Sequence, residues 1–81
     1  MMRRFRTLQV PTGVHPLVRL IFTEMNEQRI GTRDLAERSG VSAFTVEQWK
    51  FRRSPKLDCL EATLNALGIE LTTRRMVDHE G

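Results

Sequence analysis

The chain has 81 residues, of which 40% are hydrophobic and 28% are charged. This composition is ordinary for one small globular domain and excludes the low hydrophobicity and high net charge of disordered chains. No apolar run approaches the roughly 20 residues that a membrane span needs, and the basic start has no apolar stretch behind it. We therefore expect a cytoplasmic protein with no secretory signal and no membrane partner.

Positive charge is concentrated in two parts of the chain. The formal net charge is +3 and the sequence pI is about 10.0. Residues 1–23 contain four arginines and no acid, and residues 49–56 contain four basic residues and no acid. Two basic clusters on either side of a mixed middle are typical of a domain that binds a polyanion. Two solvated surfaces would give the same pattern.

Cysteine and histidine are too sparse for a disulfide or a metal site. Cys59 is the single cysteine, and His15 and His79 lie far apart along the chain. We expect Cys59 to be a small core residue, and the histidines to be surface or capping residues. No nucleophile–base pair, glycine-rich phosphate loop or carboxylate cluster is present, so the sequence predicts neither an enzyme nor a cofactor.

In chain order, residues 1–13 are predicted to form an irregular basic arm, because Pro11 and Gly13 interrupt any regular pattern. The first helix should begin near His15, with Pro16 at its first helical position, and end near Gln28. Its apolar residues recur at helical spacing: Leu17, Val18, Ile21, Phe22 and Met25. This stripe predicts an amphipathic helix whose apolar face packs inward.

Two short helices and a tight turn are predicted next. The second helix should cover residues 32–39 and stop at Gly40, which adopts a left-handed conformation without a Cβ penalty. Ser42 should cap a third helix that extends to about Phe51. Ala36 is small enough to let the two helices approach. The core between them is predicted to consist of Leu35, Val41, Val46 and Trp49.

A fourth helix is predicted from roughly Leu57 to Leu67, with Pro55 before it and Gly68 closing it. Beyond it, residues 69–73 alternate apolar and polar side chains and predict a short C-terminal strand. Such a strand would have to pair with another chain or dock on the helices. The predicted fold is an all-α, compact bundle of about four short helices, with residues 14–71 as the domain and 72–81 as a tail.

Residues 17–71 resemble the helix-turn-helix domain of phage-repressor type, the Cro and xenobiotic-response-element group. The resemblance runs through Leu-Ala-Glu-Arg-Ser-Gly-Val-Ser at 35–42, Thr-Val at 45–46, Trp49, Arg-Ser-Pro at 53–55, and Leu-Glu-Ala-Thr-Leu-Asn-Ala-Leu-Gly-Ile-Glu-Leu at 60–71. It covers about two-thirds of the chain and extends into the fourth helix, so it is more specific than a lone motif. The family usually has glycine where this chain has Arg52. Arginine disfavours left-handed backbone, so the third helix should end differently or run longer.

The resemblance implies that the third helix is a recognition helix, which lies in the major groove of double-stranded DNA. The positions that it implies for base contacts are Ser42, Ala43, Phe44, Glu47, Gln48 and Phe51. The positions for phosphate contacts are Thr32, Arg33, Thr45, Lys50, Arg52, Arg53 and Lys56. The arm side chains Arg3, Arg4 and Arg6 would reach a neighbouring groove. Glutamine pairs with adenine, glutamate accepts from cytosine and phenylalanine contacts the thymine methyl, so the residue types suit base recognition.

The implied function is a sequence-specific DNA-binding transcriptional regulator of prophage or mobile-element type. A homodimer would read two half-sites, with residues 69–73 or the fourth helix as the interface. The alternative is a protein-interaction module, such as an antitoxin that neutralises a partner toxin. The recognition face favours this alternative, because it carries Phe44 and Phe51 and no arginine. Either phenylalanine could instead be partly buried against the fourth helix or a partner chain.

Overall fold

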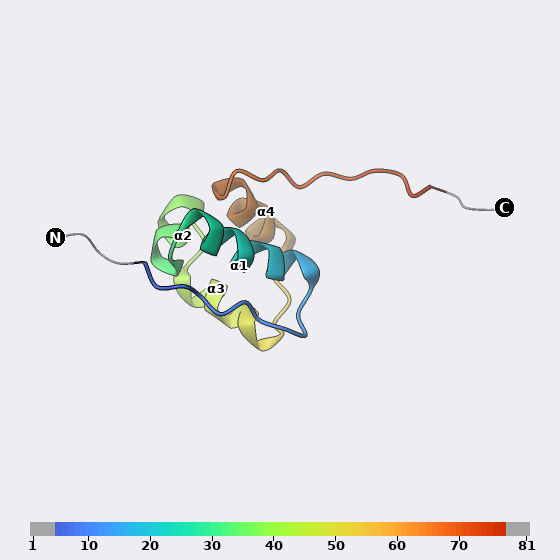
Figure 1. Cartoon of the computed structure of the whole chain (residues 1–81). Helices are drawn as coiled ribbons and strands as arrows, with labels where there is room; N and C mark the ends of the chain where they lie inside the picture. The colour runs from blue at the N-terminus through green and yellow to red at the C-terminus, as the bar shows by residue number, and fades with distance from the viewer. Residues whose placement is uncertain (1–4, 78–81) are drawn as a thin grey trace.

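Four short helices bury their apolar faces against one another in the computed structural model, which describes residues 5–77 (Figure 1). They are α1 (Pro16–Gln28), α2 (Thr32–Ser39), α3 (Ala43–Gln48) and α4 (Leu57–Ala66), and a 3₁₀ turn, η1 (Trp49–Phe51), follows α3 directly. The predicted all-α bundle of about four short helices is confirmed. Within the described residues no helix is both long enough and apolar enough to cross a membrane.

Helix α1 begins and ends at the predicted residues. Pro16 fills its first position, and the Nδ1 atom of His15 accepts a hydrogen bond from the Leu17 N–H at 3.0 Å. The helix ends at Gln28, and Arg29 follows it in the left-handed conformation, with a φ of 58°. Its inward face consists of Val18, Ile21, Phe22 and Met25, all buried. The capping role expected of His15 is therefore confirmed.

The connection between α2 and α3 is the predicted tight turn. Gly40 has a φ of 82°, and its N–H donates to the Ala36 carbonyl at 2.9 Å. Ser42 then caps α3, because its Oγ atom accepts a hydrogen bond from the Thr45 N–H at 3.1 Å. The side chains predicted to fill the space between the helices are all buried: Leu35, Val41, Val46 and Trp49. This part of the core is confirmed residue by residue.

The third helix ends at Phe51 as predicted, but its last turn is the 3₁₀ turn η1, and the residue after it has left-handed backbone. The α-helix α3 continues into the 3₁₀ turn η1, and the helical segment ends before Arg52, which has a φ of 65°. The expectation that arginine would avoid left-handed backbone here is wrong. Its guanidinium packs on the turn at Gly13, where a Cβ atom would lie only 3.2 Å from Nη2 of Arg52. That contact helps to offset the cost of the left-handed backbone.

Helix α4 closes the bundle and is tied to α1. The buried Thr63 satisfies its hydroxyl within the helix, by donating to the Leu60 carbonyl at 2.9 Å. At the end of α4, the Leu67 carbonyl accepts a hydrogen bond from Nε2 of Gln28 at 2.7 Å. Cys59 is half-buried against the core, as expected for a small apolar residue.

The predicted C-terminal strand is wrong. Residues 69–77 form no strand, since no second strand lies beside them within the described part of the chain. Ile69 and Leu71 are half-buried against the core, so this alternation reflects docking on the helices. Residues 72–77 are exposed and extend away from the bundle (Figure 1).

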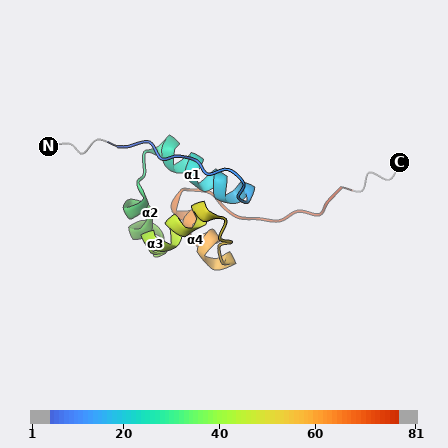
Figure 2. The same cartoon turned by 90° about the horizontal axis from the view of Figure 1, so that it is seen from below.

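The arm is docked along α1 in its described part, residues 5–13 (Figure 2). The Leu8 N–H donates to Oδ1 of Asn26 at 2.7 Å, and Nδ2 of Asn26 donates to the Leu8 carbonyl at 2.8 Å. Leu8 and Val10 are half-buried against the core. Three residues of the sequence predictions lie outside the described part of the chain: Arg3, Arg4 and His79.

Replacing Gly40 with alanine should lower the free energy of unfolding by about 1 kcal/mol, because alanine disfavours left-handed backbone. A Cβ atom at this site would meet nothing within 4 Å, so the whole cost is conformational. Urea denaturation followed by circular dichroism measures it. Gly40→Asn is the matched control, because asparagine also adds a Cβ atom but adopts left-handed backbone more readily than alanine. The control should lose less stability than Gly40→Ala. Equal losses would contradict the role of the turn.

Arg52→Gly should be more stable than Arg52→Ala by about 1 kcal/mol, although both variants lose the guanidinium. Only glycine relieves the left-handed strain at this position. For a domain of this size the difference corresponds to about 4–8 °C in Tm, which thermal unfolding resolves. If the two variants melt at the same temperature, the backbone at Arg52 is not strained.

Candidate nucleic-acid interface

The solvent-facing side of α3 and η1 carries two exposed aromatic side chains. Phe44 is 72% exposed and Phe51 is 71% exposed. Gln48 lies between them at helical spacing, so the three residues share one face. Within the described chain neither phenylalanine is covered by α4. The face predicted to contact bases is therefore accessible.

The acidic residue on α3 is balanced by a neighbouring lysine. Nζ of Lys50 lies 3.0 Å from Oε1 of Glu47, and 5.6 Å from the centroid of the buried Phe22 ring. The Lys50 side chain is half-buried in this position. Glu47 therefore repels phosphates less than its isolated charge suggests. Lys50 already has two partners, so among the predicted phosphate contacts it is less free than the exposed Arg53.

A cleft between α3 and the start of α4, called here the α3–α4 cleft, has a volume of about 270 Å³. It brings together five of the residues predicted for DNA contact: Phe44, Thr45, Gln48, Arg53 and Lys56. Pro55 also lines the cleft, and it lies in the loop that leads from η1 into α4. Predicted base and phosphate contacts thus lie side by side here.

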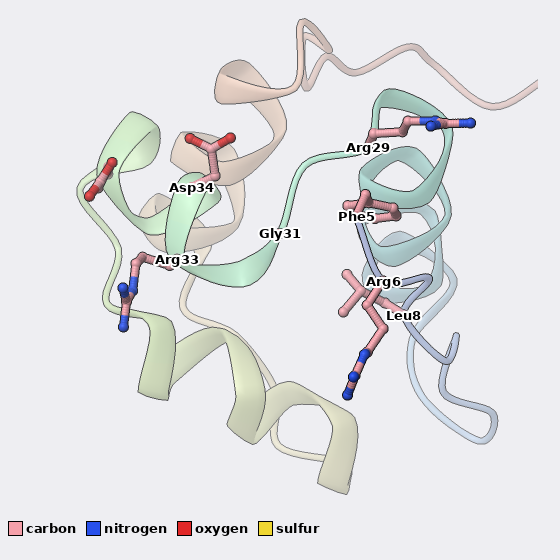
Figure 3. Close-up of a pocket in the computed structure, with 8 residues that line it drawn as sticks. Phe5, Arg6, Leu8, Arg29, Gly31, Arg33 and Asp34 are labelled. Atoms are coloured by element: carbon pink, nitrogen blue, oxygen red, sulfur yellow. The ribbon is translucent and has the colours of Figure 1, made fainter. Parts of the chain in front are cut away.

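A second and larger cleft, of about 610 Å³, lies between the arm and α2 and is called the arm–α2 cleft (Figure 3). Arg6 of the arm and Arg33 of α2 both line it, and both project toward the yellow-green ribbon of α3. Asp34 points away from that side (Figure 3) and pairs with Arg38, with 3.5 Å between Oδ1 and Nε. A predicted phosphate contact, Arg33, and a predicted arm residue, Arg6, therefore share one cleft.

Two residues of this region were missed by the sequence analysis. Arg29 lines the arm–α2 cleft, and Asn26 holds the arm in place. Arg29 had one available signal, a basic residue directly after a helix, where cations are favoured. Asn26 had none that a single sequence reveals, because its partner Leu8 lies 18 residues away.

The other predicted contact residues have mixed surroundings. Ser42 is exposed, but its hydroxyl is occupied within the cap, where it donates to Oγ1 of Thr45 at 2.9 Å. Ala43 and Thr32 are half-buried at the starts of their helices. Arg52 is exposed and packs against Gly13. In the described residues, no three His, Cys, Asp or Glu side chains gather as ligands for a metal ion.

Comparison of the chain with protein-family models, with curated proteins and with solved structures gives no match.

Proposed function

We propose that this chain is a sequence-specific DNA-binding transcriptional regulator that places α3 in the major groove of double-stranded DNA. The observation that carries the proposal is the position of α3, with its exposed phenylalanines, between basic residues of two neighbouring segments. Arg53 and Lys56 line the α3–α4 cleft with Gln48, and Arg33 projects from α2 toward the ribbon of α3 (Figure 3). This arrangement suits a helix that enters a groove bounded by two phosphate backbones.

The face of α3 supplies the groups that read base edges. Gln48 can donate to N7 and accept from N6 of adenine, and such a bidentate pair discriminates against other bases by about 1–3 kcal/mol. Phe44 and Phe51 offer apolar surface to thymine methyl groups. Glu47 can accept from the cytosine amino group once Lys50 turns toward a phosphate.

The resemblance in the sequence favours a regulator of prophage or mobile-element type that works in the cytoplasm. A homodimer is part of the proposal, because helix-turn-helix proteins usually read two half-sites related by symmetry. Ile69 and Leu71 already pack on their own chain. The exposed residues 72–77 and the exposed Leu57 of α4 are surfaces left for a second copy.

One observation favours a second function. Phe44 and Phe51 expose large apolar surfaces, which often mark protein–protein contacts. A protein-interaction module, such as an antitoxin, would use them to cover a partner. Salt dependence separates the two functions, because phosphate contacts make DNA affinity fall steeply as salt rises.

The first test is selection of binding sites from a randomised duplex pool, at low and near-physiological salt. The expected result is one enriched motif, with twofold symmetry if the protein binds as a dimer, and an affinity that falls as salt rises. No enrichment at either salt concentration would reject DNA-binding regulation and favour the interaction module.

Replacing Gln48 and Arg53 separately should give different defects. Gln48→Ala should relax the preference for one base pair of the selected motif, and cost about 1–3 kcal/mol on that motif alone. Arg53→Ala should weaken binding to all duplexes about equally and reduce the salt slope by about 1. Fluorescence anisotropy on the selected duplex and on single-base variants measures both effects. If the two variants weaken every duplex alike, the assigned roles are wrong.

A further inference from the structure

We propose that residues 5–13 of the N-terminal arm are a fixed part of the DNA-binding surface, in which Asn26 positions Arg6 to hold the phosphate backbone beside the groove that α3 enters. This inference rests on the proposed function. It assigns a second phosphate-binding segment, and it assigns a positioning role to a residue that does not itself contact DNA.

The side chain of Asn26 on α1 clamps the arm through two hydrogen bonds to Leu8. The Asn26 side chain makes two hydrogen bonds to one residue, by accepting from the Leu8 N–H at 2.7 Å and donating to the Leu8 carbonyl at 2.8 Å. Both bonds are part-buried, and Leu8 and Val10 pack against the core beside them. A side-chain amide that pairs with both backbone groups of one residue fixes its position and its orientation.

Arg6 is close in the chain to the clamped residue. Arg6 lies two residues before Leu8, so its backbone lies within about 7 Å of the clamped residue even in a fully extended chain. Its side chain is exposed and lines the arm–α2 cleft opposite Arg33. Figure 3 shows both guanidinium groups directed toward α3.

The arm–α2 cleft has more basic than acidic side chains in its lining. It is lined by three arginines (Arg6, Arg29 and Arg33) and two carboxylates (Asp34 and Glu37). The Asp34 carboxylate pairs with Arg38 outside the cleft. The side that faces α3 carries the guanidinium groups of Arg6 and Arg33 (Figure 3), and guanidinium groups bind phosphate oxygens through charge-assisted hydrogen bonds.

The clamp also explains why phosphate, rather than a base edge, is the ligand. A free basic arm can wrap into a neighbouring minor groove, whereas here Leu8, two residues after Arg6, is held against the body of the domain. A phosphate contact fixes register and carries no sequence information. Because Leu8 and Val10 are already docked before DNA binds, less conformational entropy is lost on binding.

The test uses the full chain and the duplex selected from the random pool, with affinity measured by anisotropy across a salt series. Arg6→Ala should weaken binding about twofold to fivefold at low salt and lower the salt slope by about 0.9, with an unchanged motif. Asn26→Ala should give a similar loss. The double variant should be no weaker than Asn26→Ala alone, because Asn26 acts through Arg6.

Arg19→Ala is the matched control, since it removes one exposed arginine from α1 that lines neither cleft. It should leave the salt slope closer to wild type than Arg6→Ala does. If the two substitutions have equal effects, Arg6 acts only through the net charge of the protein, and the inference is overturned. So would an additive loss in the double variant. Arg6→Ala removes only an exposed side chain, so it decides the phosphate contact even if Asn26→Ala does not fold. In that case Asn26→Asp, which keeps the acceptor for the Leu8 N–H and loses the donor to the Leu8 carbonyl, tests the positioning role by the same salt series.

The two proposals fail in different ways. If wild type binds the selected duplex with steep salt dependence and Arg6→Ala binds identically, the arm inference is wrong and the proposed function stands. If wild type binds no duplex, both are wrong.

Discussion

The left-handed turn at Gly40 is the constraint on which the recognition face depends. It reverses the chain between α2 and α3 within a few residues, so that Val41 and Val46 pack against Leu35. With those side chains buried on one side, Phe44 and the rest of the outer face must point to solvent. The same packing buries Trp49, and therefore η1 continues the α3 surface toward the basic loop. The exposed aromatic face is thus a consequence of how the inner face is packed.

Two arginines carry the positive φ angles that glycine would adopt without strain, Arg29 after α1 and Arg52 after η1. Left-handed backbone costs a residue with a Cβ atom about 1–2 kcal/mol. Both side chains lie near the arm, because Arg29 lines the arm–α2 cleft and Arg52 packs on Gly13. Strained residues concentrate where the surroundings hold them in place. The docked arm therefore belongs to the same structural unit as the ends of α1 and η1.

The docked arm adds buried apolar contacts to the core of this small domain. A chain of 81 residues buries a modest share of its surface, and the packing of Leu8 and Val10 on α1 extends a core that the helices alone would leave open. The hydrogen bonds of Asn26 satisfy backbone groups that would otherwise be half-buried without partners. Stability and the placement of Arg6 therefore have the same physical origin.

The sequence by itself determined the helices, their caps and the inner residues of the turn, because those depend on neighbours within a few positions. Helical periodicity, Pro16, Gly40 and Ser42 act locally and independently of the rest of the chain. Only the tertiary structure determined where the arm and the C-terminal segment pack on the helices. Alternation in residues 69–73 cannot distinguish a strand from an extended segment docked on helices, since the difference lies in whether a partner strand is present. Arg52 took the backbone expected of glycine in contact with Gly13, and Asn26 bonds a residue 18 positions away, contacts that local pattern does not encode.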